Sequence, residues 1–215
     1  MSAPSRRVEV APERLRRWLA GWTEGREPVR AQVTSGLVTF TGADGGEARC
    51  RVPFPPLPEG DQPAGDRLVA HVLRDRTVAV LLCRRGGHAA GVFRGRLLVA
   101  SKVGSRLVHG RSAAGGWSQH RFERRRANQA RDAWARAADD MGRILDPWRE
   151  RLDAVVVGGD REALTALAAD PRLAPLLARA EERRLDDLPT PRRAVLEQAP
   201  RRYRAVLVDL RDPTS

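Results

Sequence analysis

The sequence of 215 residues is poor in cysteine and has no long apolar run, and each shortage excludes a class of protein. Its two cysteines, Cys50 and Cys83, are too few for a disulfide framework and lack the spacing of a metal site. No stretch approaches the roughly 18 consecutive apolar residues of a membrane-spanning helix. The first residues also lack the apolar centre of a secretion signal. We therefore expect a cytoplasmic protein that makes no membrane contact.

Lysine is almost absent, yet the chain carries a large excess of positive charge. It has 39 basic and 27 acidic residues, for a net charge of +12. All basic residues except Lys102 are arginine, which a GC-rich codon bias explains, but such a bias does not explain the excess over acid. The charge predicts a polyanionic partner, most simply nucleic acid. Hydrophobic residues make up 41% of the chain, which is enough for a packed core.

The N-terminal part predicts a small unit made of one helix and one hairpin. Residues 12–24 begin with a proline, which suits a first helical turn, and their large apolar residues share one face. Residues 29–52 read as a hairpin with its turn at Asp44-Gly45. The apolar face of the helix comprises Leu15, Trp18, Leu19 and Trp22.

Residues 53–66 contain five prolines and predict a linker without regular structure. We expect a boundary here, between an N-terminal unit at residues 1–60, which includes the proline-rich stretch, and a main domain at residues 66–215.

The main domain alternates strand and helix patterns. Three short apolar runs joined by tight turns predict an antiparallel meander, and a later apolar run predicts a further buried strand. Helices follow, then a last strand or helix segment. This order predicts an α/β domain with a mixed sheet in an RNase H-like arrangement. The predicted strands are 77–83, 88–93, 96–103 and 153–157, the helices are 161–169, 171–184 and 191–198, and the last segment is 203–210.

A glycine-rich segment followed by a long helix is the most distinctive feature of the chain. Residues 110–118 include three glycines and two alanines, and a helical pattern begins at about Gln119, with Ser118 as a plausible N-cap. The first half of the helix carries a stripe of arginines, and guanidinium groups beside a helix N-terminus favour phosphates. Apolar residues recur at helical spacing at Phe122, Ala130, Trp134, Ala137, Met141, Leu145 and Trp148. The arginines are Arg121, Arg124, Arg125, Arg126 and Arg131.

Most other candidate sites are weak. An RNase H-like nuclease needs a carboxylate on its first strand, and residues 77–83 have none. The turn Gly158-Gly159-Asp160 could hold a phosphate, but we expect Asp160 to cap the following helix instead. The four histidines lack metal-ligand spacing, so we expect no metal and no cofactor. Ser118 and His120 do not form a nucleophilic pair, because adjacent side chains at a helix start point apart.

Gln119 is different, because a glutamine takes part in chemistry only by orienting a water or hydroxyl. The segment GRSAAGGWSQHRFERRR (residues 110–126) resembles the catalytic segment of eukaryotic-type class 1 release factors. It is closer to the actinobacterial release-factor-like peptidyl-tRNA hydrolases of ribosome quality control, the VLRF family. The resemblance extends to residues 81–104, 124–130 and 155–164.

This resemblance implies hydrolysis of the ester between a nascent peptide and tRNA, in the peptidyl transferase centre of the large ribosomal subunit. The implied catalytic segment is Gly115, Gly116, Ser118 and Gln119, with Gln119 positioning the water. The implied contacts with rRNA or tRNA are Arg111, Arg121, Arg124, Arg125 and Arg126. Partners are then the ribosome, rRNA and peptidyl-tRNA, and we expect a monomer.

The sequence departs from the class 1 release factors in one respect. Counting back from Arg121-Phe122, their glutamine would fall on Trp117, so Gln119 is displaced by two residues. Two alternatives follow. The protein could be a ribosome- or RNA-binding factor that keeps the fold without hydrolysis, or a general nucleic-acid-binding module driven by charge. Aromatic residues are scarce along the arginine stripe, which disfavours binding by base stacking.

Overall fold

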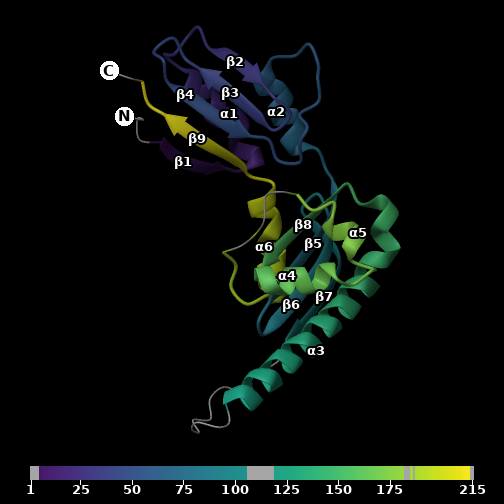
Figure 1. The fold of residues 1–215 in the computed structure, drawn as a ribbon. Helices are drawn as coiled ribbons and strands as arrows, with labels where there is room; N and C mark the ends of the chain where they lie inside the picture. Colours follow the sequence, from purple (N-terminus) through teal and green to yellow (C-terminus); the bar gives the residue numbers. More distant parts are fainter. Residues whose placement is uncertain (1–4, 106–118, 182–184, 186, 214–215) are drawn as a thin grey trace. The chain divides into compact units, whose positions relative to one another are not determined.

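The computed structural model describes residues 5–105, 119–181, 185 and 187–213 (Figure 1). The chain forms two compact units, one made of the residues up to Arg74 together with those from Arg201, the other of Asp75–Pro200. Among the described residues, no helix is long and apolar enough to cross a membrane.

The first unit is an antiparallel sheet with two helices packed on one face. The strand order is β1-β9-β4-β3-β2, and alternate strand residues such as Val38, Cys50 and Val208 are buried against the helices. The helices contribute Leu15, Leu19, Leu68 and Val72 to the same core. The elements are β1 (Ser5–Val10), α1 (Pro12–Thr23), β2 (Arg30–Val33), β3 (Leu37–Thr41), β4 (Glu47–Arg51), α2 (Ala64–Leu73) and β9 (Val206–Arg211).

The predicted first helix matches α1, with Pro12 in its first turn. The predicted hairpin is present as β3 and β4, joined around Asp44-Gly45. Its first arm is divided, because the chain turns between Thr34 and Leu37 and gives an additional edge strand, β2. Helix α2 was not expected; it begins directly after Pro63, where a missing backbone N–H costs the helix nothing.

The division into units differs from the expected boundary at residues 60–66. Strand β9 lies between β1 and β4, so the C-terminal end of the chain belongs to the first unit. The proline-rich stretch has no regular structure, as expected, but it packs within this unit rather than joining two bodies. Leu57 is buried, and the Nε2 atom of His71 on α2 lies 2.9 Å from the carbonyl oxygen of Pro53.

The second unit is a mixed sheet, which confirms the predicted fold class. Strands β5, β6 and β7 form the antiparallel meander, and β8 pairs parallel to β5, giving the order β7-β6-β5-β8. Helices α3 and α4 cover one face of the sheet. Leu196 of α6 packs against Gly91 on the opposite face. The elements are β5 (Thr77–Arg84), β6 (Gly87–Arg94), β7 (Leu97–Ser105), α3 (Gln119–Leu145), the 3-10 turn η2 (Asp146–Arg151), β8 (Ala154–Gly159), α4 (Arg161–Ala168), α5 (Ala174–Leu177) and α6 (Arg193–Tyr203).

One predicted helix is much shorter than expected. The pattern of residues 171–184 predicted a helix of that length, but α5 ends at Leu177. After it the chain runs beside β8: Ala180 bridges Val155, and the N–H of Leu185 donates to the carbonyl oxygen of Val157. Pairing with a buried strand therefore replaces the last turns of the predicted helix.

Candidate functional site: a projecting helix and its supports

Among the side chains of helix α3 that the structure describes, those that pack on the core lie in its C-terminal half. Ala137, Met141 and Leu145 are buried against the sheet, and Trp134 packs at the edge of the same cluster. Asn128, Gln129, Arg131 and Asp132, one to two turns earlier, are exposed. At 1.5 Å per residue, the fifteen residues from Gln119 to Ala133 extend the helix about 22 Å beyond Trp134, the first described side chain of α3 that packs on the core. Figure 1 shows this part of α3 reaching past the end of the sheet.

A buried histidine holds the packed half of α3 to two strands. The Nε2 atom of His88 on β6 lies 3.0 Å from Oδ2 of Asp140 on α3. Only 9% of His88 is exposed. On its other side the ring lies against Gly104 of β7, where an added Cβ would come within 2.2 Å of an imidazole carbon. Gly104 is therefore the residue that lets the histidine fit between sheet and helix, one residue before β7 ends.

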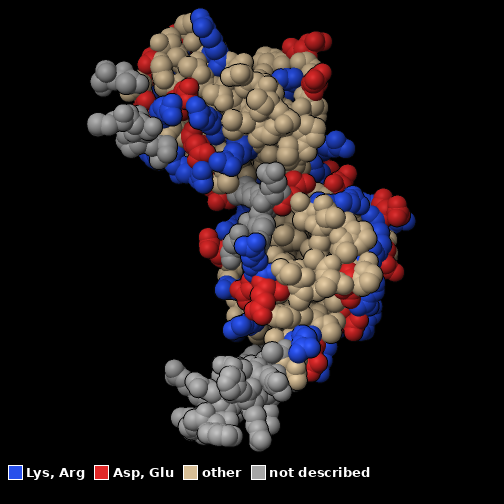
Figure 2. Space-filling model, viewed as in Figure 1, with Lys and Arg blue, Asp and Glu red and all other residues tan. Residues whose placement is uncertain are grey.

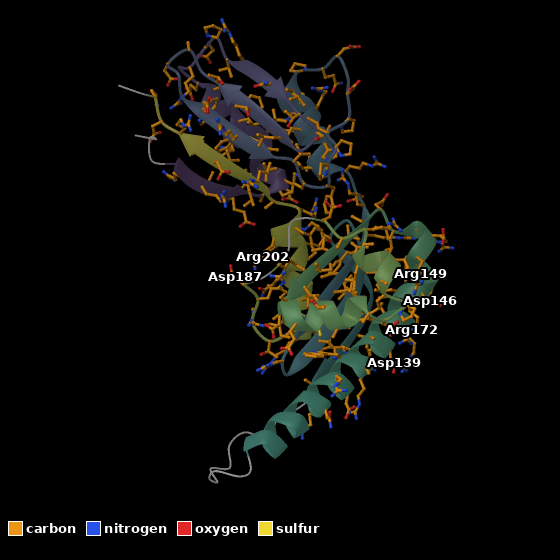
Figure 3. All side chains as sticks on the ribbon, viewed as in Figure 1. Asp139, Asp146, Arg149, Arg172, Asp187 and Arg202 are labelled. Atoms are coloured by element: carbon orange, nitrogen blue, oxygen red, sulfur yellow. The ribbon has the colours of Figure 1, made fainter. Side chains whose placement is uncertain are left out.

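A network of ion pairs holds the same helix on its exposed side. Arg172, in the turn before α5, bonds to Asp139 of α3 at 2.8 Å and to Asp170 at 2.7 Å. The hydrogen bond from Arg172 lowers the pKa of Asp170 to about 2. Arg149 of η2 pairs with Asp146 and also donates to the carbonyl oxygen of Arg172. Figure 3 shows Asp139, Asp146, Arg149 and Arg172 along this side of the unit. The network links α3, η2 and the turn before α5.

The structure places part of the predicted catalytic segment. The helix begins at Gln119, as expected, and Arg121, Arg124, Arg125 and Arg126 fall in its first turns. The side chains of these residues lie outside the described part of the chain, as do Arg111, Gly115, Gly116, Trp117 and Ser118. Their roles stay predictions. The structure does describe the two elements on either side of this segment, since β7 ends at Ser105 and α3 begins at Gln119.

The acidic residue at the start of β8 makes a structural contact with the backbone. Asp153, at the start of β8, accepts a hydrogen bond from the N–H of Thr77 at 2.7 Å. Across the described ranges, no group of three or more histidine, cysteine or acidic side chains could hold a metal ion.

The expected cap at Asp160 is only partly correct. Asp160 occupies the N-cap position of α4, but its side chain makes no capping hydrogen bond. It accepts instead from Nε of Arg84 at 3.1 Å and from the N–H of Arg85 at 2.8 Å. Packing and backbone conformation explain why the two residues before Asp160 are glycines. A Cβ at Gly158 would lie 2.4 Å from the carbonyl oxygen of Leu185, and Gly159 has a φ of +116°. This turn therefore joins β8 to β5.

Cys50 and Cys83 are both buried and free. Burial raises the pKa of each thiol to about 12, assisted at Cys83 by the charge of Asp160. The thiols are therefore neutral and unsuited to nucleophilic chemistry.

Comparison with known proteins decides the family. A family model described as the actinobacteria/chloroflexi VLRF1 release factor matches residues 76–209. The chain belongs to this family. The match covers the second unit and the first part of β9, and it confirms the resemblance inferred from the segment around Gln119. A VLRF1-family protein is release-factor-like, which gives this chain a role in translation.

Among curated proteins, none matches the chain. A similar solved structure is the archaeal translation termination factor aRF1, with 16% identity and a TM-score of 0.44. That match covers 91% of this VLRF1-family chain and 64% of the archaeal one.

Sequence reasoning missed the residues that support α3. His88 was considered only as a metal ligand, and neither its partner Asp140 nor the Arg172 network was expected. The signal available was faint: Gly104 directly follows the predicted strand 96–103, and a glycine in a strand often marks a close approach of another group.

Proposed function

We propose that this protein is a peptidyl-tRNA hydrolase that releases nascent peptides from stalled ribosomal complexes. The observation that carries the proposal is the projection of α3. Its first fifteen residues extend about 22 Å beyond the core, and they begin with Gln119 and the arginine stripe. A thin helix tip of this length suits entry into a narrow RNA-lined cavity, as the peptidyl transferase centre requires. Membership of the VLRF1 release factor family supports the same function.

In the proposed reaction, Gln119 orients a water molecule toward the carbonyl carbon of the peptidyl ester. The water oxygen bonds to this carbon, and the bond from the carbon to the ribose oxygen breaks. One proton of the water passes to the ribose oxygen, which becomes a free hydroxyl of the tRNA, and the peptide leaves with a carboxyl group. The N–H of Gln119 can donate to the developing oxyanion. Neither a metal nor a cofactor takes part in these steps.

The neighbouring residues have supporting roles in this proposal. Gly115 and Gly116 allow the segment to pass close to RNA, since they lack side chains, and Ser118 caps the helix. The arginines contact rRNA or the acceptor end of tRNA through phosphate groups. In this proposal the protein acts as a monomer in the cytoplasm and binds the large ribosomal subunit and peptidyl-tRNA. Residues 106–131 carry seven arginines and one acid, and this balance supports an RNA partner.

A second candidate function is ribosome binding without hydrolysis of peptidyl-tRNA. The displacement of the glutamine by two residues relative to class 1 release factors favours it. In this case the protein would bind the large subunit through the same arginines, and replacing Gln119 would have no effect.

The deciding experiment measures peptide release from stalled nascent-chain complexes of the large subunit. It compares the wild type with Gln119→Ala and Trp117→Ala. Loss of release in Gln119→Ala alone supports the proposed hydrolase. Loss in Trp117→Ala alone moves the catalytic position to the register of class 1 release factors. If the wild type binds the large subunit normally but releases no peptide, the protein is the non-catalytic ribosome-binding factor.

A further inference from the structure

The first unit presents a solvent-facing side of its sheet, which none of the functions above uses. Helices α1 and α2 both pack on the other side, through the cluster that contains Val38, Phe40 and Val208. Strand register then fixes which residues share the outer side. One row runs Gln32, Thr39, Arg49, Asp209, Arg7. The row on one side of it runs Arg30, Thr41, Glu47, Arg211, and the row on its other side runs Leu37, Arg51, Leu207, Glu9.

Arginines dominate this outer side, and they share their acidic partners. Asp209 contacts both Arg7, at 2.5 Å, and Arg51, at 3.5 Å. Glu47 contacts both Arg49, at 3.0 Å, and Arg211, at 3.8 Å. Four guanidinium groups therefore surround two carboxylates. Arg30 on β2 adds a fifth positive charge and Glu9 on β1 a third negative one, so the face keeps an excess of positive charge. In Figure 2 basic and acidic side chains alternate over the region where Figure 1 places β9 and β1.

Folding stability does not account for this arrangement. The four guanidinium side chains are 44% to 59% exposed, and exposed ion pairs contribute little to stability. One arginine for each carboxylate would balance the charge. A guanidinium group has five N–H donors, and one carboxylate can engage at most two donors of the same guanidinium, so each arginine keeps donors for another acceptor. The carboxylates thus hold the guanidinium groups in place without neutralising them.

The chemistry of the face identifies its partner. Spare guanidinium forks bind phosphates, and the hydroxyl groups of Thr39 and Thr41, on the same face, can donate to phosphate oxygens. Arg49 and Arg51 are two residues apart on β4, so their side chains leave the strand about 7 Å apart. Across the face as the structure describes it, there is no aromatic side chain on which a base could stack. The face therefore suits contact with the phosphate backbone of a nucleic acid, without recognition of its bases.

We infer that the outer side of the β1-β9-β4-β3-β2 sheet is a second RNA-binding surface, which grips the phosphate backbone independently of the segment around Gln119. The inference rests on the proposed function only in taking the RNA to be ribosomal. In this arrangement the first unit supplies sequence-independent affinity for the ribosome, while the tip of α3 supplies the chemistry.

The test measures binding of the full-length protein to purified large ribosomal subunits over a range of salt concentrations. The variant Arg49→Gln/Arg51→Gln removes two charges, yet Glu47 keeps Arg211 and Asp209 keeps Arg7. The control Arg14→Gln/Arg17→Gln removes the same charge from exposed positions on α1. Loss of two phosphate contacts should lower the slope of log K against log salt by about 1.5 and weaken binding roughly tenfold near 0.1 M salt. The control should match the wild type.

A gain-of-contact variant keeps the test decisive if the double variant folds poorly. Thr39→Arg places a new guanidinium in the same row as Arg49 and should steepen the salt dependence by about 0.7–0.9. Identical slopes for the face variants and the α1 control would overturn the inference. So would a loss of binding confined to phosphatidylserine-containing vesicles or to an acidic polypeptide, with binding to the subunit unchanged.

Failure of this inference and failure of the proposed function give different results. Gln119→Ala should stop peptide release while leaving subunit affinity and its salt slope intact. The Arg49→Gln/Arg51→Gln variant should instead recover its release rate at saturating protein concentration, since the chemistry is untouched.

Discussion

His88 on β6 and Asp140 on α3 meet at 3.0 Å although 52 residues separate them in the chain. The contact joins the meander to the helix that carries the proposed catalytic residue. It is largely withdrawn from solvent, with side-chain exposures of 11% for His88 and 20% for Asp140. A hydrogen bond in such a place costs more to break than a similar one at the surface.

Asp140→Ala should therefore lower the free energy of unfolding by about 1–3 kcal/mol, because it leaves a buried imidazole nitrogen without its partner. Asp139→Ala is the matched control. Its carboxylate pairs with Arg172 half-exposed to solvent, so its loss should cost less than about 1 kcal/mol. Urea denaturation monitored by tryptophan fluorescence measures both. Equal costs at the two neighbouring positions would contradict the structural role assigned to His88.

Gly104→Ala should destabilise the fold by about 1–3 kcal/mol, as overpacking in a core does. The new methyl group would fall within 2.2 Å of the His88 ring, so the ring or the strand would have to shift. The additional change His88→Ala should restore part of the stability. Gly21→Ala is the control. Nothing lies within 4 Å of a Cβ at that position of α1, so the change should be neutral or stabilising. Thermal unfolding distinguishes these cases, and a Gly104→Ala protein as stable as the wild type would be inconsistent with this packing.

Deleting residues 127–133 should abolish peptide release and leave the fold intact. These seven residues precede Trp134, the first of the described α3 side chains to pack against the core. Their removal shortens the projection by about 10 Å, while the helix face turns by only about 20°. Gln119 would then stop short of the ester.

The double substitution Asn128→Ala/Gln129→Ala tests whether the sequence of this stretch, rather than its length, matters. Both residues are exposed, so release and unfolding should match the wild type. Undiminished release by the deleted protein would argue against the reach of α3 as the basis of the activity.

The Asp170–Arg172 pair should make stability depend on pH in acid. The pKa of Asp170 is lowered to about 2 in the folded protein, chiefly by the hydrogen bond from Arg172, against about 3.9 when unfolded. A depressed pKa contributes stability above the unfolded value, and that contribution is lost as pH falls toward 2. Asp170→Asn should thus be less stable than the wild type at pH 6, and the difference should shrink between pH 4 and pH 2. A difference that stays constant over this range would exclude the ion pair as its cause.

Local patterns predicted the second unit well. The apolar run at residues 77–83 and the glycine turns after it correspond to β5, β6 and β7, because short turns bring neighbouring strands together. The spacing of Trp134, Ala137, Met141 and Leu145 identified the packed face of α3. Gln119 was expected at the start of this helix, and the structure begins the helix there.

The differences between the predicted and the observed structure come from pairing between residues that are distant in the chain. Residues 203–210 have the apolar content of a strand, but nothing local tells which sheet they join, and β9 pairs with β1 and β4 at the other end of the chain. The helix expected at residues 171–184 ends early because the chain pairs with β8 instead. Asp160 bonds to Arg84 rather than capping α4, a choice set by a strand 76 residues away.

By itself, then, the sequence determined the family, the mixed sheet and the position of the helix that begins at Gln119. These depend on periodicity and on a short motif, and both are properties of neighbouring residues. Only the tertiary structure decided that β9 completes the first unit, that His88 and Asp140 support α3, and that five arginines gather on one side of a sheet. Each of these requires residues distant in the chain to meet, and their register is selected by the burial of apolar side chains on the other face.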